Sequence, residues 1–176
     1  MTNQGKKFET QFVKAVPADY VKYVRVNDST GMFGKNANLR FSNKNGFDFF
    51  LWQSKQLRLY CLELKTKKGK SISFERTKEE QGKKDIHYHQ IKALTEWDKY
   101  DGTVCGFVIE FREIETTFFI HIKHFNELIS VIPKKSFNWK DLQENNIPYF
   151  VIPQHKLKTN YKYDLELFLT NNNDVA

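Results

Sequence analysis

Blocks of apolar residues separated by polar segments predict a series of strands. Residues 57–64 (LRLYCLEL) form an apolar, β-prone run, and residues 47–52 (FDFFLW) form a second run just before it. The polar residues 53–56 (QSKQ) between the two runs are typical of a turn. The two runs therefore predict a β-hairpin.

Helical spacing marks two amphipathic segments. Near the N-terminus, apolar side chains recur at helical intervals before a proline: Phe8, Phe12, Val13, Val16 and Pro17. Within residues 84–100, apolar side chains at spacings of three form a stripe: Ile91, Leu94 and Trp97. We expect two helices, the second covering one face of a sheet.

The second half of the chain adds further elements. Residues 103–111 and 116–122 predict two core strands joined by a charged turn at 112–115. Short helices are expected at 125–132 and 138–145, the latter capped by Asn138, then an apolar run at 149–152 and a final segment at 163–169. Together these elements predict an α/β (α+β) fold, with a mixed β-sheet core flanked by helices.

Composition favours a single domain over residues 1–176. A chain of 176 residues with 40% hydrophobic content can bury one sizeable core, and no linker or repeat divides it. Cys61 and Cys105 fall inside predicted strands and are expected to be small buried hydrophobes. No stretch reaches transmembrane length and the N-terminus is charged, so we expect a cytoplasmic protein without a membrane partner. The Asn-rich tail 171–176 is expected to be disordered.

The basic charge is concentrated in the first hundred residues. They hold 20 Lys or Arg against 11 acids, whereas the remainder holds 8 against 10, and the whole chain carries +7. This excess suits a polyanion such as DNA, although a basic surface is common on soluble proteins. The densest stretch, residues 65–84, carries eight cations and three acids. We expect three of its lysines to contact DNA: Lys67, Lys68 and Lys70.

Asp48 and Glu63 lie on the two arms of the predicted hairpin. Strand alternation places Glu63 and Lys65 on one face, and strand pairing brings Asp48 towards Glu63. Counted from a turn near residues 54–55, Asp48 lies six or seven residues back and Glu63 eight or nine forward. We therefore expect a register offset or a bulge between them.

Two carboxylates beside a lysine fit metal-dependent phosphodiester hydrolysis. Mg2+ prefers oxygen ligands and typically binds one or two carboxylates plus substrate phosphate oxygens, and Mn2+ is expected to substitute for it. We expect Asp48 and Glu63 to bind the metal and Lys65 to orient water or offset charge. The simpler reading of Glu63 and Lys65 is an exposed ion pair on a strand. Glu9, in the first helix, either favours the helix dipole or reaches the metal site.

His87 and His89 do not predict a zinc site. They lie two residues apart on the expected helix, should point to different sides, and have no cysteine pair nearby. Surface histidines, or a histidine that contacts phosphate, are the better interpretations.

Five separated motifs occur in order: G-K-K-F-E at 5–9, N-G-F-D at 45–48, L-E-L-K-T-K at 62–67, S-I-S-F at 71–74 and H-Y-H-Q-I at 87–91. Together they resemble the RecU family of Holliday junction resolvases, within the PD-(D/E)XK nuclease superfamily. The resemblance implies a restriction-endonuclease-like core, a homodimer, branched DNA as substrate and a set of catalytic residues: Glu9, Asp48, Glu63, Lys65 and Gln90. Phe47 replaces the superfamily's proline, and no second acid stands beside Asp48, which leaves one or two metals open.

Residues 28–46 match the stalk that RecU-like proteins carry between the first two strands of the core. The segment is rich in Gly and Asn, and its cations are interleaved with Met32, Phe33 and Phe41. Cations neutralise phosphates and aromatic side chains stack on exposed bases, so we expect DNA contacts here, at Lys35, Arg40 and Lys44. A flexible surface loop is the alternative.

The sequence therefore predicts a Mg2+-dependent endodeoxyribonuclease that resolves four-way junctions by paired symmetric nicks in DNA recombination and repair, with no small-molecule substrate. Two alternatives remain: a general or sequence-specific nuclease on the same scaffold, and a junction-binding protein that does not cleave. Three charged side chains gathered around one site, Asp48, Glu63 and Lys65, argue against the second alternative.

Overall fold

A computed structural model describes residues 4–26, 46–80 and 82–171. Its centre is a six-stranded sheet of order β1-β2-β3-β5-β6-β8. The strands are β1 (Val21–Arg25), β2 (Phe49–Gln53), β3 (Arg58–Lys67), β5 (Thr103–Phe111), β6 (Thr116–His121) and β8 (Phe150–Ile152). β3 and β5 pair in parallel and the other neighbours are antiparallel, which confirms the expected mixed sheet.

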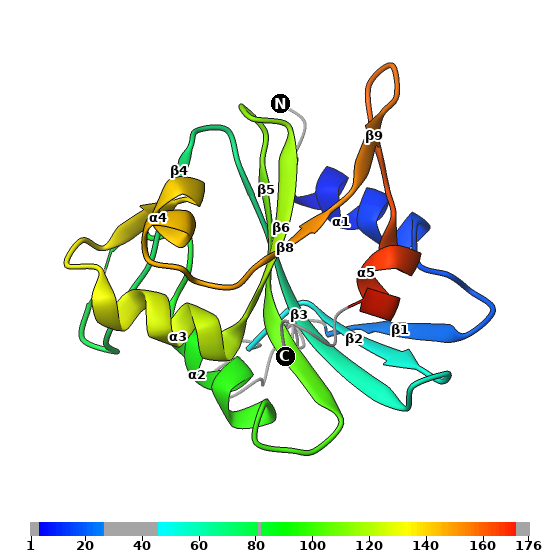
Figure 1. The fold of residues 1–176 in the computed structure, drawn as a ribbon, viewed down its shortest axis with the longest axis horizontal. Coiled ribbons are helices and arrows are strands. Elements are labelled where there is room, and N and C mark those ends of the chain that lie inside the picture. Colours follow the sequence, from blue (N-terminus) through cyan, green and yellow to red (C-terminus); the bar gives the residue numbers. More distant parts are fainter. Residues whose placement is uncertain (1–3, 27–45, 81, 172–176) are drawn as a thin grey trace, which may run out of the picture.

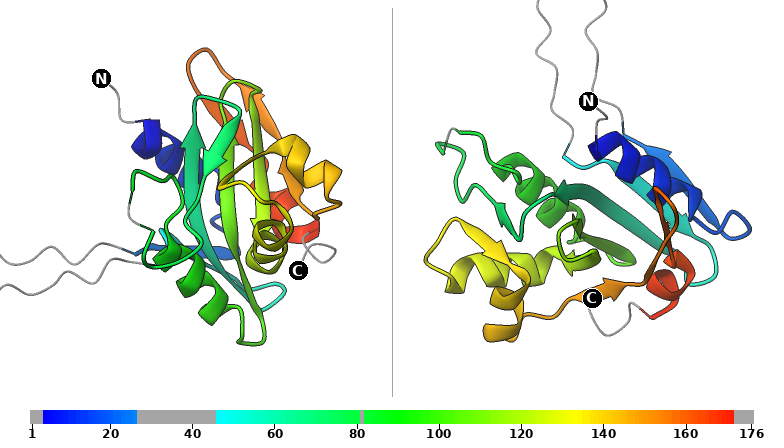
Figure 2. Two further views of the ribbon diagram at one scale, coloured as in Figure 1. Left: turned by 90° about the vertical axis from the view of Figure 1, so that its left-hand side faces the viewer. Right: turned by 90° about the horizontal axis from the view of Figure 1, so that it is seen from above.

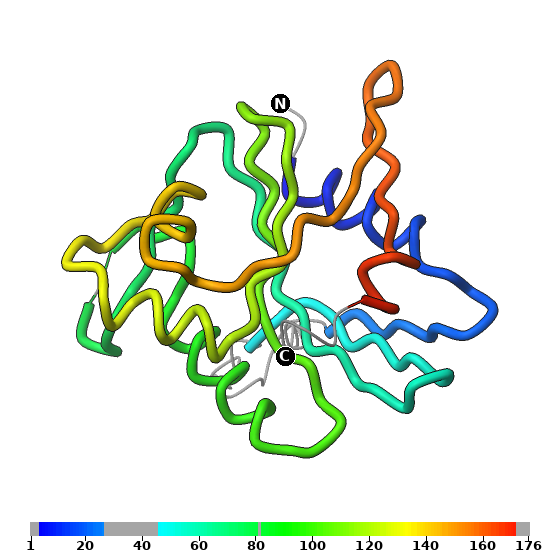
Figure 3. Tube along the Cα trace, viewed as in Figure 1, coloured from blue at the N-terminus to red at the C-terminus, as the bar shows by residue number. Residues whose placement is uncertain are grey.

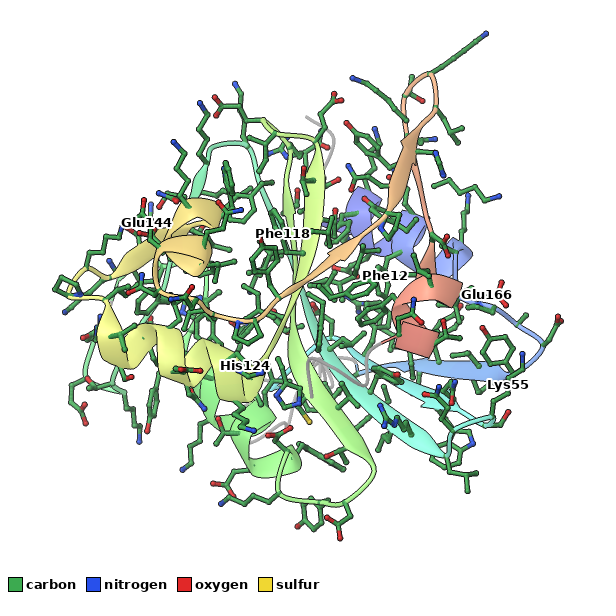
Figure 4. All side chains as sticks on the ribbon, viewed as in Figure 1. Phe12, Lys55, Phe118, His124, Glu144 and Glu166 are labelled. Carbon is green, nitrogen blue, oxygen red and sulfur yellow. The ribbon has the colours of Figure 1, made fainter. Side chains whose placement is uncertain are left out.

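Helices cover both faces of this sheet (Figures 1 and 2). The five helices of the described chain are α1 (Gln4–Lys14), α2 (Tyr88–Trp97), α3 (Ile122–Val131), α4 (Trp139–Glu144) and α5 (Leu165–Asn171). α2, α3 and α4 pack on one face, whereas α1 and α5 pack on the other. Figure 4 shows Phe118 and Phe12 on opposite sides of the sheet, one in each core. The α+β architecture expected from the sequence is therefore confirmed.

The central strand β5 is buried on both faces and contributes to both halves of the core. Eight of its nine residues are buried, which is the pattern of a central strand covered on both faces. Alternate side chains enter the two cores, with Phe107 on the α3 side and Val108 on the α1 side. Cys61 and Cys105 are paired across β3 and β5 and are fully buried, as the sequence predicted.

The second predicted helix is shorter than expected and begins at Tyr88. Residues 84–87 are not helical because tertiary contacts hold them in another conformation. The backbone N–H groups of Asp85 and Ile86 donate to the carbonyl of Ser73, and Ile86 forms a β-bridge with Phe74. His87 is the N-cap residue in extended geometry.

Four three-residue strands were not predicted, and β1 was expected only as the core strand before the stalk, without bounds. β4 (Ser71–Ser73) pairs with β7 (Ser136–Asn138), and β9 (Gln154–Lys156) pairs with β10 (Tyr161–Tyr163). The final segment consequently begins as a strand, and its helix extends to Asn171, which was expected to lie in a disordered tail. The rest of that tail, 172–176, and the predicted stalk up to residue 45 lie outside the described residues. In the described part of the chain, no helix is both long and apolar enough to cross a bilayer.

Candidate active site

The β2–β3 hairpin brings Asp48 and Glu63 close together, each one residue beyond the last pair of the ladder. Gln53 pairs with Arg58 and Phe49 pairs with Leu62, so four residues, 54–57, form the turn. Asp48 immediately precedes Phe49, and Glu63 immediately follows Leu62. The turn is centred between residues 55 and 56, so both arms have equal length and the unequal counts expected from the sequence disappear.

Backbone contacts hold Asp48 in place at the start of β2. Its Oδ2 accepts a hydrogen bond from the backbone N–H of Leu64 at 2.8 Å, and its own N–H donates to the carbonyl of Leu62 at 3.0 Å. The approach to Asp48 is crowded, because a Cβ atom at Gly46 would lie 2.1 Å from that of Ala93 on α2. Glycine is required there for the chain to pass the helix.

Glu63 is buried, with 4% of its surface exposed, and two polar side chains contact it. Its Oε1 lies 2.8 Å from the Lys65 Nζ and accepts a hydrogen bond from the Gln90 Nε2 at 2.6 Å. The Gln90 Oε1 accepts from the backbone N–H of His87 at 3.0 Å, at the start of α2. α2 therefore orients the Gln90 amide so that its donor faces Glu63.

Burial disfavours the charged form of both carboxylates. It raises the pKa of Glu63 to about 8; repulsion from Asp48 adds to this rise and the Lys65 ammonium opposes it. Burial also raises the pKa of Asp48, against the hydrogen bond from the Leu64 backbone, with a further rise from Glu9. A cation placed between the two acids would favour their charged forms.

These side chains suit a hard divalent cation. Both acids offer carboxylate oxygens, which Mg2+ prefers, and burial raises the pKa of each acid even with the Lys65 ammonium nearby. No group of three or more His, Cys, Asp or Glu residues that could hold a metal occurs within the described ranges. The described residues thus offer two carboxylates here, and an ion bound between them would take its other ligands from water and phosphate oxygens.

Glu9 lies at the margin of this site. Its Oε2 accepts from Arg25 on β1, with the Nε and Nη2 atoms each at 3.0 Å. Its charge contributes to the raised pKa of Asp48, and that of Arg25 lowers it. The structure therefore places Glu9 near Asp48 but pairs it with an arginine that the sequence did not single out.

The expectation that His87 and His89 point to different sides is wrong. Their rings stack at 5.6 Å with an interplanar angle of 15°, because His87 precedes the helix instead of lying in it. Glu75 fixes this start: its Oε1 lies 3.0 Å from the His87 Nδ1, and its Oε2 accepts from the Tyr88 N–H at 2.8 Å. Sequence reasoning missed Glu75, because its partners His87 and Tyr88 lie 12 and 13 residues further along the chain.

Lysines after the E-x-K motif have different surroundings. Lys67 donates to both oxygens of Asp85, at 2.7 and 2.8 Å, whereas Lys68 is exposed in the turn after β3. Lys70, also exposed, lies 3.4 Å from Glu113. The other expected DNA contacts, Lys35, Arg40 and Lys44, lie outside the described residues.

Comparison with known proteins identifies relatives of the chain. A family model for recombination protein U (RecU) matches residues 66–164, more than half of the chain. The match does not reach the two carboxylates, so their roles rest on the geometry above. The chain is also 32% identical over 173 residues to the SPbeta prophage-derived uncharacterized protein YotM of Bacillus subtilis strain 168, covering 93% of this chain and 83% of that protein. The chain therefore belongs to the RecU family, a family of Holliday junction resolvases.

Proposed function

We propose that this protein is a Mg2+-dependent, structure-selective endonuclease that resolves four-way DNA junctions by paired symmetric nicks. The observation that carries the proposal is the pairing of Asp48 with the buried Glu63 beside the Lys65 ammonium, 2.8 Å away. Membership of the RecU family supports a role in recombination-related junction processing. The prophage origin of a relative is compatible with a phage enzyme acting in the cytoplasm of an infected bacterium.

The proposed roles follow from the contacts. Asp48 and Glu63 would hold Mg2+, or Mn2+ in its place; a bound ion polarises the phosphoryl group and lowers the pKa of its water. Gln90 keeps the Glu63 carboxylate oriented through its 2.6 Å hydrogen bond. Lys65 lies where an ammonium can orient water and offset charge on the phosphate. The oxygen of a water molecule forms the new bond to phosphorus, one ester P–O bond breaks, and the released sugar oxygen takes up a proton in place of the one that the water loses.

Glu9 completes the charge balance of the proposed site. The Glu9 carboxylate lies close to Asp48, and its ion pair with Arg25 neutralises its charge. We propose that the Glu9 and Arg25 pair positions the Asp48 side of the site and does not itself bind the metal.

We also propose that the enzyme is a homodimer, because two opposed strands must be cut at one junction. β1 is the outermost strand of the sheet, and on the α2 side it forms an exposed apolar patch with β2 and the end of α2. The patch comprises Val24, Phe50, Trp52, Trp97 and Tyr100. Val24 is 57% and Trp52 44% exposed, which is unfavourable for large apolar side chains unless a partner covers them. A second copy pairing through this patch would supply the second site.

Cleavage of defined DNA substrates tests the proposal. Four-way, three-way and linear duplex DNA are incubated with the purified protein in Mg2+ or in EDTA. We expect paired nicks in the four-way junction only with Mg2+, and little cutting of linear duplex. Equal cutting of all three substrates would favour a general nuclease, and tight junction binding without cutting would favour a non-cleaving binding protein.

A further inference from the structure

A cavity of about 150 Å³ lies between α1, the end of β5 and the β9–β10 hairpin. Its polar lining includes two cations, two amides, a carboxylate and a phenol: Lys7, Arg112, Gln4, Gln11, Glu110 and Tyr161. It is separate from the carboxylate site. Glu110 pairs with Thr66, whose side chain lies on the opposite face of β3 from that of the neighbouring Lys65.

The lining favours an anion. Glu110 has both oxygens occupied, by the Thr66 hydroxyl and by the Tyr163 hydroxyl at 3.0 Å. The Glu110 carboxylate is therefore held at the sheet. Lys7 and Arg112 carry two positive charges against its one negative charge, so the lining has a net charge of +1. The Arg112 Nε is buried and has no hydrogen-bond partner among the residues that the structure describes. A buried donor without an acceptor is costly, and a bound anion would satisfy it.

The β9–β10 hairpin forms the outer wall of the cavity and carries further cations. Figure 3 shows the hairpin beside α1, and side-chain hydrogen bonds join the two. Lys7 donates to the carbonyl of Thr159, and Gln11 contacts both the Asn160 side chain and the Tyr161 N–H at 3.1 Å. Residues 154–163 contain no acid and three exposed lysines: Lys156, Lys158 and Lys162.

The two acids on the neighbouring β5–β6 turn are paired with lysines. Glu115, on the turn between β5 and β6, pairs with Lys156, and Glu113 on the same turn pairs with Lys70. The hairpin thus presents Lys158 and Lys162 without a carboxylate partner in the described chain. An elongated polyanion fits this arrangement better than a single small anion.

We propose that this cavity, with the hairpin lysines beside it, binds a phosphate of the DNA backbone on the opposite side of the sheet from the carboxylate site. The inference rests on DNA being the substrate. The cavity and the carboxylate site lie on different faces, so diverging arms of branched DNA reach both more readily than a straight duplex does. The C-terminal hairpin then contributes to selection of branched DNA.

Binding measurements in EDTA, where no cleavage is expected, test this inference apart from catalysis. Affinity for a fluorescent four-way junction is measured by anisotropy over a salt series. Arg112→Gln should weaken binding about tenfold and reduce the slope of log K against log salt by about 0.9, the value for one lost phosphate contact. Arg112→Lys should restore most of the slope. Linear duplex should lose less affinity than the junction.

Lys99→Gln is the matched control, since Lys99 is exposed, pairs with Glu96 and lies beyond the far end of α2. It should change neither affinity nor slope. If Arg112→Gln lowers the melting temperature below the assay temperature, Lys158→Gln at the exposed hairpin turn is measured instead. Unchanged affinity and slope in the variant measured would overturn the inference even if the protein cuts junctions. If affinity depends on Arg112 but the protein never cuts DNA, the phosphate site is supported and the proposed nuclease activity is rejected.

Discussion

At the residue scale, the active-site hypothesis depends on two carboxylates with different surroundings. Asp48 accepts a backbone hydrogen bond, whereas Glu63 is held by the side chains of Lys65 and Gln90. The Asp48 charge also raises the pKa of Glu63 and so makes its ionisation less favourable. Neither acid substitutes for the other, so each should be essential.

We expect Asp48→Asn and Glu63→Gln each to reduce junction cleavage at least about a hundredfold, because each removes a charged ligand for the metal. Binding to the junction in EDTA should change little. Single-turnover cleavage and anisotropy measure the two effects. Glu113→Gln, an exposed carboxylate on the turn after β5, is the control and should cleave normally. Full activity of both site variants would remove the two acids from the mechanism.

The raised pKa of Glu63 predicts a pH dependence of stability. Its pKa is about 8 in the folded protein and 4.5 as the ordinary value. Between these values the unfolded chain has lost a proton that the folded chain keeps, so stability falls as pH rises, by at most about 1.4 kcal/mol per unit. The Glu63→Gln variant has no ionisable group at this position, so its stability does not fall with rising pH in this way. In EDTA, its melting temperature should exceed that of the wild type by a margin that widens from pH 5 to pH 8. Parallel curves would contradict the raised pKa.

The sequence predicted which residues lie together better than it predicted what holds them. The order of motifs singled out Asp48, Glu63, Lys65 and Gln90, and alternation put Glu63 and Lys65 on one face. The supporting partners are distant in sequence, so no local pattern could identify them. They include Arg25 for Glu9 and Glu75 for the start of α2.

At the element scale, apolar blocks were predicted well, and three-residue strands without such a block were not. β5 was predicted with its observed bounds because its burial is continuous. The strands β4, β7, β9 and β10 carry no such block and form because a distant partner pairs with them. Local propensity is a weak guide to such segments, since pairing is decided by tertiary contacts.

Asp85 connects β3 to β4 and should matter for the stability of this region. Its carboxylate accepts from Lys67, from the Ser73 N–H at 2.8 Å and from the Ser73 hydroxyl at 2.7 Å. Burial opposes ionisation, but these hydrogen bonds outweigh it and hold the pKa of Asp85 below its ordinary value of 3.8. Its contribution is therefore complete above about pH 4 and disappears as the pH falls through the lower folded value.

Asp85→Asn should accordingly lower the free energy of unfolding by about 1 kcal/mol at pH 7, a figure reduced for the partial exposure of Lys67. Urea unfolding at pH 7 and pH 3.5 measures the difference, which should shrink at the lower pH. Glu113→Gln, whose partner Lys70 is exposed, should have little effect at either pH. An equal loss at both pH values would show that the charge of Asp85 is not what stabilises β4.

At the scale of the whole molecule, the position of the predicted stalk is informative. The described residues on either side of it meet beside the site, because Arg25 pairs with Phe49 and the Val26 N–H donates to the Asp48 carbonyl at 2.8 Å. Deleting residues 33–43 should leave this hairpin base intact. We expect junction selectivity or cutting to fall by more than duplex affinity, as measured by competition between four-way and linear DNA. Equal losses on both would make the segment a general phosphate contact.

The exposed apolar patch allows the homodimer to be tested without touching either carboxylate. Lys22 pairs with Trp52 and Val24 with Phe50, so Trp52 and Val24 share the sheet face beside Trp97. Trp52→Glu would place a charge in a dimer interface, where burial without a partner costs several kcal/mol. The variant should sediment as a monomer at concentrations where the wild type is a dimer.

Loss of the dimer should also change the products of cleavage. A dimer with two sites can cut both opposed strands in one binding event, whereas a monomer should release singly nicked junctions. Leu167→Glu introduces the same charge at an exposed apolar position of α5, on the opposite face of the sheet, and should leave both sedimentation and paired cutting unchanged. A Trp52→Glu protein that still sediments as a dimer would move the interface elsewhere. If the wild-type protein sediments as a monomer and still makes paired nicks, paired cutting does not require a dimer in solution.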